Sequence, residues 1–229
     1  MRFLQTNVIA HRGASADHPE NTVEAFRAAG PLGANWVELD VRRTSDGALA
    51  VHHDAHLGDG RAIVAIPATD LPPSVPSLAE ALEACQPLGV NVEIKNSPHD
   101  VDFDPAAALV EPVVAVIAAA AQPILVSSFH GPTLDRVRAV DPSIHTALLT
   151  FDLGDVARTI GDAVAAGHVG LHPFDRTVTR ELVGMAHDAG LLINVWTVDD
   201  PARIEELAEM GVDGIVTNVP AVAAAVLRG

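Results

Sequence analysis

The chain of 229 residues is 48% hydrophobic and 19% charged, a composition that supports a sizeable folded core and excludes a wholly disordered protein. Acidic residues outnumber basic ones by 30 to 14, and the formal net charge of −16 repels phosphate backbones and anionic lipid, so a nucleic-acid-binding protein is not expected. The one cysteine, Cys85, excludes an intramolecular disulfide and a zinc site built from cysteines.

The sequence contains no apolar run of the ~18 residues that a membrane-spanning helix needs. Its most apolar stretch, 110–121, contains Pro112 and is typical of a covered helix. The N-terminal segment 1–13 has too short an apolar run for a signal peptide and leads directly into a predicted strand. We therefore expect a cytoplasmic protein, although a secreted form whose leader has been removed would look the same.

Short apolar runs alternate with helical segments along the whole chain. The runs predict eight strands, at 8–10, 36–40, 90–94, 124–127, 146–150, 169–172, 192–198 and 214–217. Helix signals lie between them: Ser77 with Glu80 three positions later forms a capping box, and the pair 200–201 (Asp-Pro) begins a helix that Gly211 ends.

This alternation predicts an α/β protein with a parallel sheet and right-handed crossovers. Eight strand–helix units in slightly less than the ~250 residues typical of the fold predict a closed (β/α)8 TIM barrel. An open doubly wound sheet is the competing architecture, but no predicted strand leads into a Gly-x-Gly-x-x-Gly turn.

The connection after the second predicted strand is much longer than an ordinary βα loop. It begins with a turn at Asp46-Gly47, continues with 48–53 as a short extra strand, and then becomes rich in proline and glycine. We interpret 43–77 as a small insertion that caps the barrel mouth, within a single catalytic domain that covers 1–229.

Polar residues gather at the predicted strand ends, where barrel enzymes place their chemistry. Glu38 and Asp40 close the second strand on one face, because side chains alternate, with Cα atoms ~6–7 Å apart. Glu93 and Lys95 share one face of the next strand. Taken alone, the Glu38–Asp40 pair is also typical of a solvated loop entry, and the Glu93–Lys95 pair is also typical of a surface ion pair. Together, three carboxylates at neighbouring strand ends repel one another unless a cation neutralises them, and oxygen ligands favour Mg²⁺ or Ca²⁺.

Several short blocks follow one another in a specific order along nearly the whole chain. They are Ile9-Ala10-His11-Arg12-Gly13, Pro19-Glu20-Asn21-Thr22, Ala25-Phe26, Glu38-Leu39-Asp40-Val41, Thr44, Asp46-Gly47, His53-Asp54, Pro76-Ser77-Leu78, Glu93-Ile94-Lys95, Ser127-Ser128-Phe129, Val195-Trp196-Thr197-Val198 and Gly214-Ile215-Val216-Thr217-Asn218-Val219-Pro220. In these blocks the chain resembles the glycerophosphodiester phosphodiesterases, whose members are TIM barrels.

The resemblance implies a role for each matching position. It implies that Glu38, Asp40 and Glu93 ligate a divalent metal and that His11 and His53 perform acid–base catalysis. It implies that Arg12 and Lys95 contact the phosphate, with Glu20 and Asn21 as a supporting polar pair. It also implies that Phe129 and Trp196 line the glycerol pocket.

The resemblance also implies the reaction. A small glycerophosphodiester would be hydrolysed to sn-glycerol 3-phosphate and an alcohol. The 2-hydroxyl of the substrate would attack phosphorus, one histidine would take its proton and the other would protonate the leaving alcohol, and water would then open a cyclic phosphate. Histidine suits both roles because its unperturbed pKa is ~6.5.

Two features of the motif region need separate interpretation. His52 adjoins His53, and strand alternation turns only one of them inward; we predict His53, because Asp54 follows it as in the family. After this block the family commonly has leucine, then arginine and two threonines, whereas here Leu57 is followed by Gly58-Asp59-Gly60-Arg61. This departure concerns the contacts of the cap with the alcohol group of the substrate.

Two other functions compete with hydrolysis of small glycerophosphodiesters. A lyase of the sphingomyelinase D or lysophospholipase D type would act on lipids and need an apolar approach to its site, for which 63–66 in the cap is a weak candidate. A non-catalytic barrel that binds a ligand should have lost a histidine or a carboxylate, and none is missing. The sequence does not indicate the oligomeric state.

Overall fold

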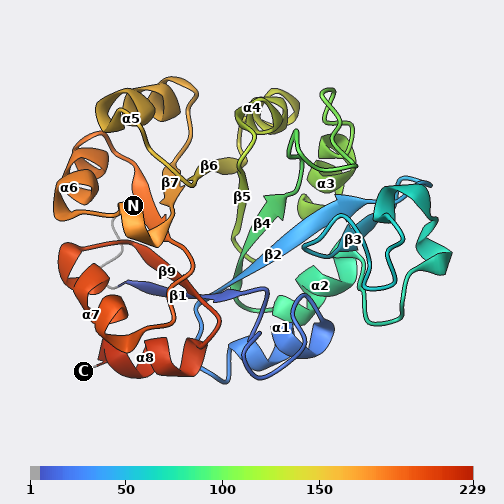
Figure 1. The fold of residues 1–229 in the computed structure, drawn as a ribbon, viewed down its shortest axis with the longest axis horizontal. Coiled ribbons are helices and arrows are strands. Elements are labelled where there is room, and N and C mark those ends of the chain that lie inside the picture. The colour runs from blue at the N-terminus through green and yellow to red at the C-terminus, as the bar shows by residue number, and fades with distance from the viewer. Residues whose placement is uncertain (1–5, 229) are drawn as a thin grey trace.

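The computed structural model describes residues 6–228, which form a parallel barrel surrounded by helices (Figure 1). In this part of the chain the strands are β1 (Asn7–His11), β2 (Trp36–Arg43), β3 (Leu49–Val51), β4 (Gly89–Ile94), β5 (Ile124–Ser128), β6 (His145–Thr150), β7 (Gly170–Pro173), β8 (Leu192–Val195) and β9 (Gly214–Thr217). They pair in the order β1-β9-β8-β7-β6-β5-β4-β2-β3, and β1 also pairs with β2. Because that last pairing closes the ring, all strands except β3 form the predicted (β/α)8 barrel.

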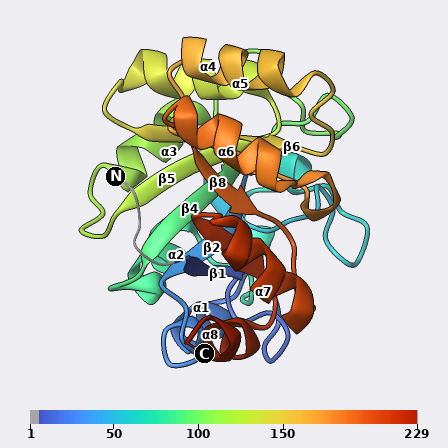
Figure 2. The same cartoon turned by 90° about the vertical axis from the view of Figure 1, so that its left-hand side faces the viewer.

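Helices cover the outside of the barrel, as Figure 2 shows from a second side. They are α1 (Val23–Ala29), α2 (Leu78–Cys85), α3 (Val110–Ile117), α4 (Gly131–Val140), α5 (Val156–Ala165), α6 (Arg180–Asp188), α7 (Pro201–Met210) and α8 (Pro220–Arg228), with short 3-10 turns η1 (Ile63–Ala65), η2 (Ala68–Asp70) and η3 (Asp175–Thr177). The predicted capping box at Ser77 and Glu80 is present in full. Gly211 ends α7 with a φ of 89°, a backbone conformation that glycine adopts without steric cost.

The main core lies between the barrel strands and the covering helices. Leu39, Ile94 and Ile193 from the strands and Phe26 and Leu207 from the helices are at most 1% exposed. Burial of such side chains is worth ~1.5–3 kcal/mol each, which fixes the strands and hence the side chains at their carboxyl ends.

The insertion after β2 has a small core of its own. β3 pairs antiparallel with β2, and Ala50, Leu57 and Ile63 form a second buried cluster against which Ile66 packs. Arg43, the first residue of the predicted insertion 43–77, is also the last residue of β2.

Two strand ends differ from the prediction by three residues each. β2 does not close at Asp40 but continues to Arg43, because its last three residues pair with β3. The strand predicted at 192–198 ends at Val195, and the next residue, Trp196, forms only an isolated bridge with Phe174.

Among residues 6–228, no helix is both long enough and apolar enough to cross a membrane. The first five residues of segment 1–13, for which the sequence predicts no signal peptide, lie outside the described residues.

Candidate active site

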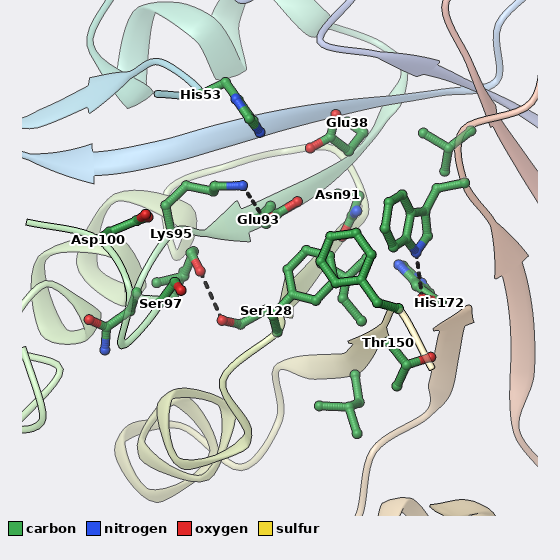
Figure 3. Close-up of a pocket in the computed structure, with 18 of the residues that line it drawn as sticks. Glu38, His53, Asn91, Glu93, Lys95, Ser97, Asp100, Ser128, Thr150 and His172 are labelled. Atoms are coloured by element: carbon green, nitrogen blue, oxygen red, sulfur yellow. Dashed lines mark hydrogen bonds and ion pairs between the residues drawn. The ribbon is translucent and has the colours of Figure 1, made fainter. Parts of the chain in front are cut away.

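A cavity of about 760 Å³ opens at the carboxyl ends of the barrel strands. His11 lines it together with Glu38, His53, Glu93 and Lys95, so most of the polar residues predicted at separate strand ends lie in one place. Figure 3 shows the last four of these residues. The parallel sheet produces this convergence, because every barrel strand ends on the same face of the molecule.

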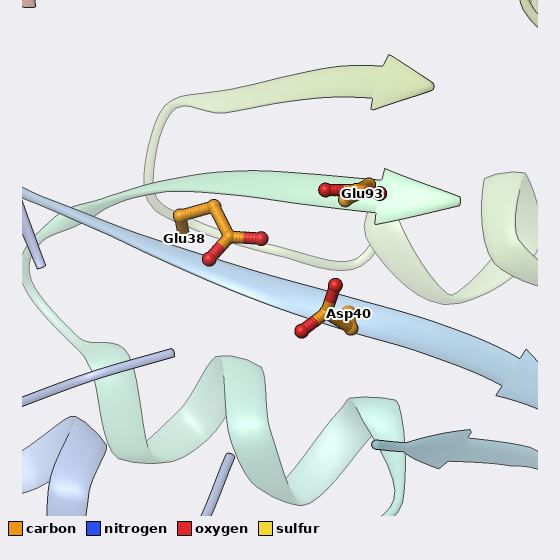
Figure 4. Close-up of side chains that lie close together, drawn as sticks. All are labelled: Glu38, Asp40 and Glu93. Carbon is orange, nitrogen blue, oxygen red and sulfur yellow. The ribbon is translucent and has the colours of Figure 1, made fainter. Parts of the chain in front are cut away.

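Three carboxylates form the acidic centre of the site. Glu38 and Asp40 lie on β2, and Asp40 is in register with Glu93 on β4. One oxygen from each residue lies within 4.8 Å of the others, and the three side chains turn toward a common point (Figure 4). All three residues are less than 9% exposed, so water does not screen their mutual repulsion.

The charges of the triad are unevenly compensated. Burial and the nearby charges of Asp40 and Glu93 raise the pKa of Glu38 well above its usual range. Burial also raises the pKa of Glu93, against the attraction of Lys95, whose Nζ donates a 2.8 Å hydrogen bond to Glu93 Oε1. Burial would raise the pKa of Asp40 as well, but Lys95, His53 and Arg12 outweigh it and the pKa is lowered.

The geometry of the triad fits a divalent cation. Glu38 Oε1 is buried and accepts no hydrogen bond from the described residues. A buried carboxylate oxygen without a donor is unstable unless it is protonated or ligates a cation. The all-oxygen donor set suits a hard ion such as Mg²⁺ or Ca²⁺.

Arg12 occupies a strained position directly after β1. Its φ of 56° is rare for a residue with a side chain, and such strain is often found at functional sites. Its backbone N–H donates to Glu38 Oε2 at 3.0 Å, its Nη1 donates to both carboxylate oxygens of Glu20 at 2.9 and 2.8 Å, and its Nε lies 3.4 Å from Asp40 Oδ2. Asn21 donates from Nδ2 to Asp40 Oδ2 at 2.8 Å. Asn21 thus supports the triad directly, and Glu20 supports it through Arg12.

His11 is held by Asn218, a residue for which the sequence predicted no role in the site. Asn218 Oδ1 lies 2.7 Å from His11 Nδ1, and because an amide oxygen accepts, Nδ1 carries the proton. His11 Nε2 is then free of hydrogen, and it lies 3.9 Å from Glu38 Oε2. Burial and the charge of Arg12 lower the pKa of His11. Asn218 was detectable only as a polar residue directly after the last barrel strand.

His53, and not His52, lines the cavity. His53 Nδ1 lies 2.7 Å from Asp54 Oδ1, which leaves Nε2 toward the cavity (Figure 3). Burial lowers the pKa of His53, with further lowering by Lys95 and Arg12. His52 instead bonds the backbone oxygen of Asp54 at 2.9 Å.

An aromatic wall faces the acidic centre across the cavity. Phe129 and Trp196 were expected there, and their rings are 5.4 Å apart. Phe151 stacks on Phe129 at 4.7 Å, and Phe174 lies 5.3 Å from Trp196. In the structure each of the four aromatic residues directly follows the last residue of one of the consecutive strands β5 to β8. Among the strands predicted from the sequence, only 146–150 is directly followed by its aromatic residue, so Phe151 was the detectable one of the two missed residues.

The fold and the site together define a class: a (β/α)8-barrel enzyme whose mouth joins an acidic, metal-competent triad to two imidazoles, two cations and an aromatic wall. Comparison with known proteins then gives the family. A model of the glycerophosphoryl diester phosphodiesterase family matches residues 11–63 and 60–222, and the chain belongs to this family.

Individual relatives agree with this assignment. The chain is 31% identical to a glycerophosphodiester phosphodiesterase of Caldanaerobacter subterraneus subsp. tengcongensis, with 95% of this chain and 96% of the relative covered. It is also 31% identical to a glycerophosphodiester phosphodiesterase of Bacillus altitudinis, with coverage of 94% and 95%. The protein is therefore an enzyme of the phosphoric diester hydrolase class, and the family supports glycerophosphodiester hydrolysis.

Solved structures show the same fold. An Oleispira antarctica phosphodiesterase in complex with the product sn-glycerol-3-phosphate superposes with a TM-score of 0.90 at 24% identity, with 98% of each chain covered. A glycerophosphodiester phosphodiesterase from Thermotoga maritima superposes with a TM-score of 0.83 at 25% identity, with 96% of this chain and 98% of the other covered.

Proposed function

We propose that this enzyme hydrolyses small glycerophosphodiesters to sn-glycerol 3-phosphate and an alcohol, with Mg²⁺ or Ca²⁺ held by Glu38, Asp40 and Glu93. The convergence of these three buried carboxylates beside two histidines carries the proposal. A bound cation would supply charge neutralisation at the phosphoryl oxygens. Arg12 and Lys95 would hold the same oxygens and stabilise the charge that develops on them.

The two histidines would move the protons. The 2-hydroxyl oxygen of the glycerol unit forms a bond to phosphorus while the bond from phosphorus to the alcohol oxygen breaks. One histidine, neutral and without a proton on Nε2, accepts the hydroxyl proton there, and the other, in its doubly protonated imidazolium form, donates the proton of its Nε2 to the leaving oxygen. Both rings bind their partners, Asn218 and Asp54, through Nδ1 and so keep Nε2 for this exchange. Water then opens the cyclic phosphate with the two proton transfers reversed. The attack is intramolecular and benefits from proximity.

Water-soluble substrates fit this site better than membrane lipids. The net charge of −16 disfavours docking on an anionic bilayer. The apolar segment 63–66, which a lipid-directed enzyme would need as an approach surface, is largely committed to the core of the insertion: Ile63 is fully buried and Ile66 packs on the same cluster.

Hydrolysis of glycerophosphocholine with and without chelator tests the metal. EDTA should abolish release of sn-glycerol 3-phosphate, and Mg²⁺ or Ca²⁺ should restore it; full activity in EDTA would refute the metal-dependent reaction. Because binding to the folded state stabilises it, the effective ion should also raise the Tm of the wild type but not of Glu38→Gln.

Substrate analogues test the mechanism. An analogue whose glycerol unit lacks the 2-hydroxyl should be inert, because no group remains to attack phosphorus. Normal turnover of that analogue would replace the cyclic phosphate with direct attack by water. A tenfold or greater preference for lysophosphatidylcholine over glycerophosphocholine would instead establish the lysophospholipase D reaction. The cytoplasmic location stays a prediction, which cell fractionation would test.

A further inference from the structure

The cavity lining contains three side chains with a buried, unpaired polar atom that the mechanism above does not use: Asn91, Thr150 and His172. Asn91 on β4 and His172 on β7, which form the floor of the cavity, are 2% and 1% exposed (Figure 3). Asn91 Oδ1 and His172 Nδ1 are buried and form no hydrogen bond with any residue in 6–228. Buried polar atoms are nearly always paired, so these two atoms indicate a ligand in the cavity.

The hydrogen-bond partners of His172 define what its free nitrogen offers. Asn194 Nδ2 lies 3.0 Å from His172 Nε2, and because an amide nitrogen donates, Nε2 must accept. Burial lowers the pKa of His172 to about 3, so the ring is neutral near pH 7 and its one proton is on Nδ1. Trp196 Nε1 donates to the backbone oxygen of His172 at 2.6 Å and holds this part of β7 against the aromatic wall. His172 therefore presents a fixed N–H donor.

Asn91 presents the complementary atom. Its side-chain oxygen is an acceptor without a donor, and its residue is in register with Glu38 on the neighbouring strand. Asn91 precedes Glu93 by two residues and so shares its face of β4, roughly 6–7 Å deeper along the strand. The separation between Asn91 and the acidic centre along the strand is therefore about the length of a three-carbon polyol.

One uncharged donor and one uncharged acceptor match a hydroxyl group, which accepts and donates at once. An anionic group would face the oxygens of Asn91 and Glu38, and an ammonium group would face the N–H of His172. An alkyl group would leave both atoms unpaired at the cost of their desolvation.

We propose that Asn91 and His172 bind the terminal hydroxyl of the glycerol unit, the one that neither carries phosphate nor attacks it. The inference rests on the proposed function and adds a specificity determinant to it. A substrate acylated at this hydroxyl, such as a 1-acyl lysophospholipid, has no proton to give Asn91 and brings a chain that the buried floor does not admit.

The wild-type enzyme tests the proposal with a matched substrate pair. Glycerophosphocholine is compared with the phosphocholine ester of propane-1,2-diol, which keeps the attacking hydroxyl and lacks the terminal one. We expect kcat/KM to be ~10–100-fold lower for the diol ester, because one or two buried polar atoms lose a partner. Equal kcat/KM for the two esters overturns the proposal and leaves the proposed function intact. Failure to hydrolyse any glycerophosphodiester removes both.

Variants locate the effect within the floor. Asn91→Leu should lower kcat/KM for glycerophosphocholine but not for the diol ester, so that the ratio between the two substrates falls toward 1. Ser127→Ala is the matched control, because Ser127 Oγ is also buried without a partner but Ser127 does not line the cavity; this variant should keep the wild-type ratio. An unchanged ratio in Asn91→Leu contradicts the proposal. If Asn91→Leu does not fold, the wild-type substrate pair decides.

Discussion

Replacement of Arg42 by methionine should weaken both the fold and the catalytic geometry. Arg42 lies near the end of β2 and its side chain is only 3% exposed. Its Nη1 donates to both oxygens of Asp102 at 2.8 and 2.7 Å, its Nη2 donates to Asp100 at 3.0 Å, and its Nε donates to the backbone oxygen of His53 at 2.8 Å. One side chain therefore ties the strand that carries two triad carboxylates to two other walls of the cavity.

The magnitude follows from burial. The Asp102 side chain is 5% exposed, and Arg42→Met would leave it charged and unpaired, which costs about 3–5 kcal/mol in the free energy of unfolding. For a chain of this length that corresponds to a fall in Tm of roughly 6–20 °C. Because His53 also loses the anchor of its backbone, kcat should fall as well.

Urea unfolding, with glycerophosphocholine hydrolysis in parallel, measures both effects. Arg43→Met is the matched control, because Arg43 is the next residue of β2 and its side chain makes no hydrogen bond within residues 6–228; the expected change is within about 0.5 kcal/mol. The double variant Arg42→Met/Asp102→Leu should recover most of the lost stability, since no buried charge is left unpaired. A loss below about 1 kcal/mol in Arg42→Met would refute the reasoning, because a pair worth so little behaves as a solvated one.

Three further predictions use the same purified protein. Ala at His11 or His53 should lower kcat by ~10²–10⁴-fold with unchanged circular dichroism, while His52→Ala stays near wild type; the reverse result for the adjacent pair would show that the wrong histidine was assigned. Folding lowers the pKa of His172 from 6.5 to about 3, so between these pH values the unfolded chain binds more protons at this residue than the folded chain. The contribution of neutral His172 to the free energy of unfolding is therefore complete above pH 6.5 and is lost as the pH falls toward 3. The free energies of unfolding that urea melts give for wild type and His172→Gln should converge as the pH falls from 7 to 4. Burial raises the pKa of the Cys85 thiol, so a thiol reagent should label Cys85 only after unfolding, and rapid labelling of the native enzyme would contradict its burial.

Much of the fold was predictable because local signals agreed with one another. The capping box at Ser77 and Glu80 and the glycine stop at Gly211 fall where the structure has helix ends, since these residues satisfy backbone groups within one turn. The shared face of Glu38 and Asp40 follows from the two-residue period of a strand, and the parallel sheet supplies Glu93 in register.

The end of β2 was not predictable from its own residues. Arg42 and Arg43 look like a solvated loop entry, yet Arg42 is 2% exposed, because β3 pairs with this segment and Asp102 neutralises the guanidinium. The carboxylates that pair with the Arg42 guanidinium lie about 60 residues further along the chain, so no local sequence pattern indicates them. The same holds for Asn218 beside His11, which the closure of the barrel brings together from opposite ends of the sequence.

The charges at the site explain why a cation and a phosphodiester belong together here. When all three carboxylates are ionised, as cation binding requires, Glu38, Asp40 and Glu93 oppose Arg12 and Lys95, which leaves one net negative charge. A phosphodiester also carries one negative charge, so the side chains alone would repel it. A divalent cation bound by the triad would reverse the balance to one positive charge, and the low exposure of these groups would make the reversal strong. Because coupling between two ligands is reciprocal, a bound phosphodiester must tighten the cation site by the same factor by which the cation tightens the phosphodiester site.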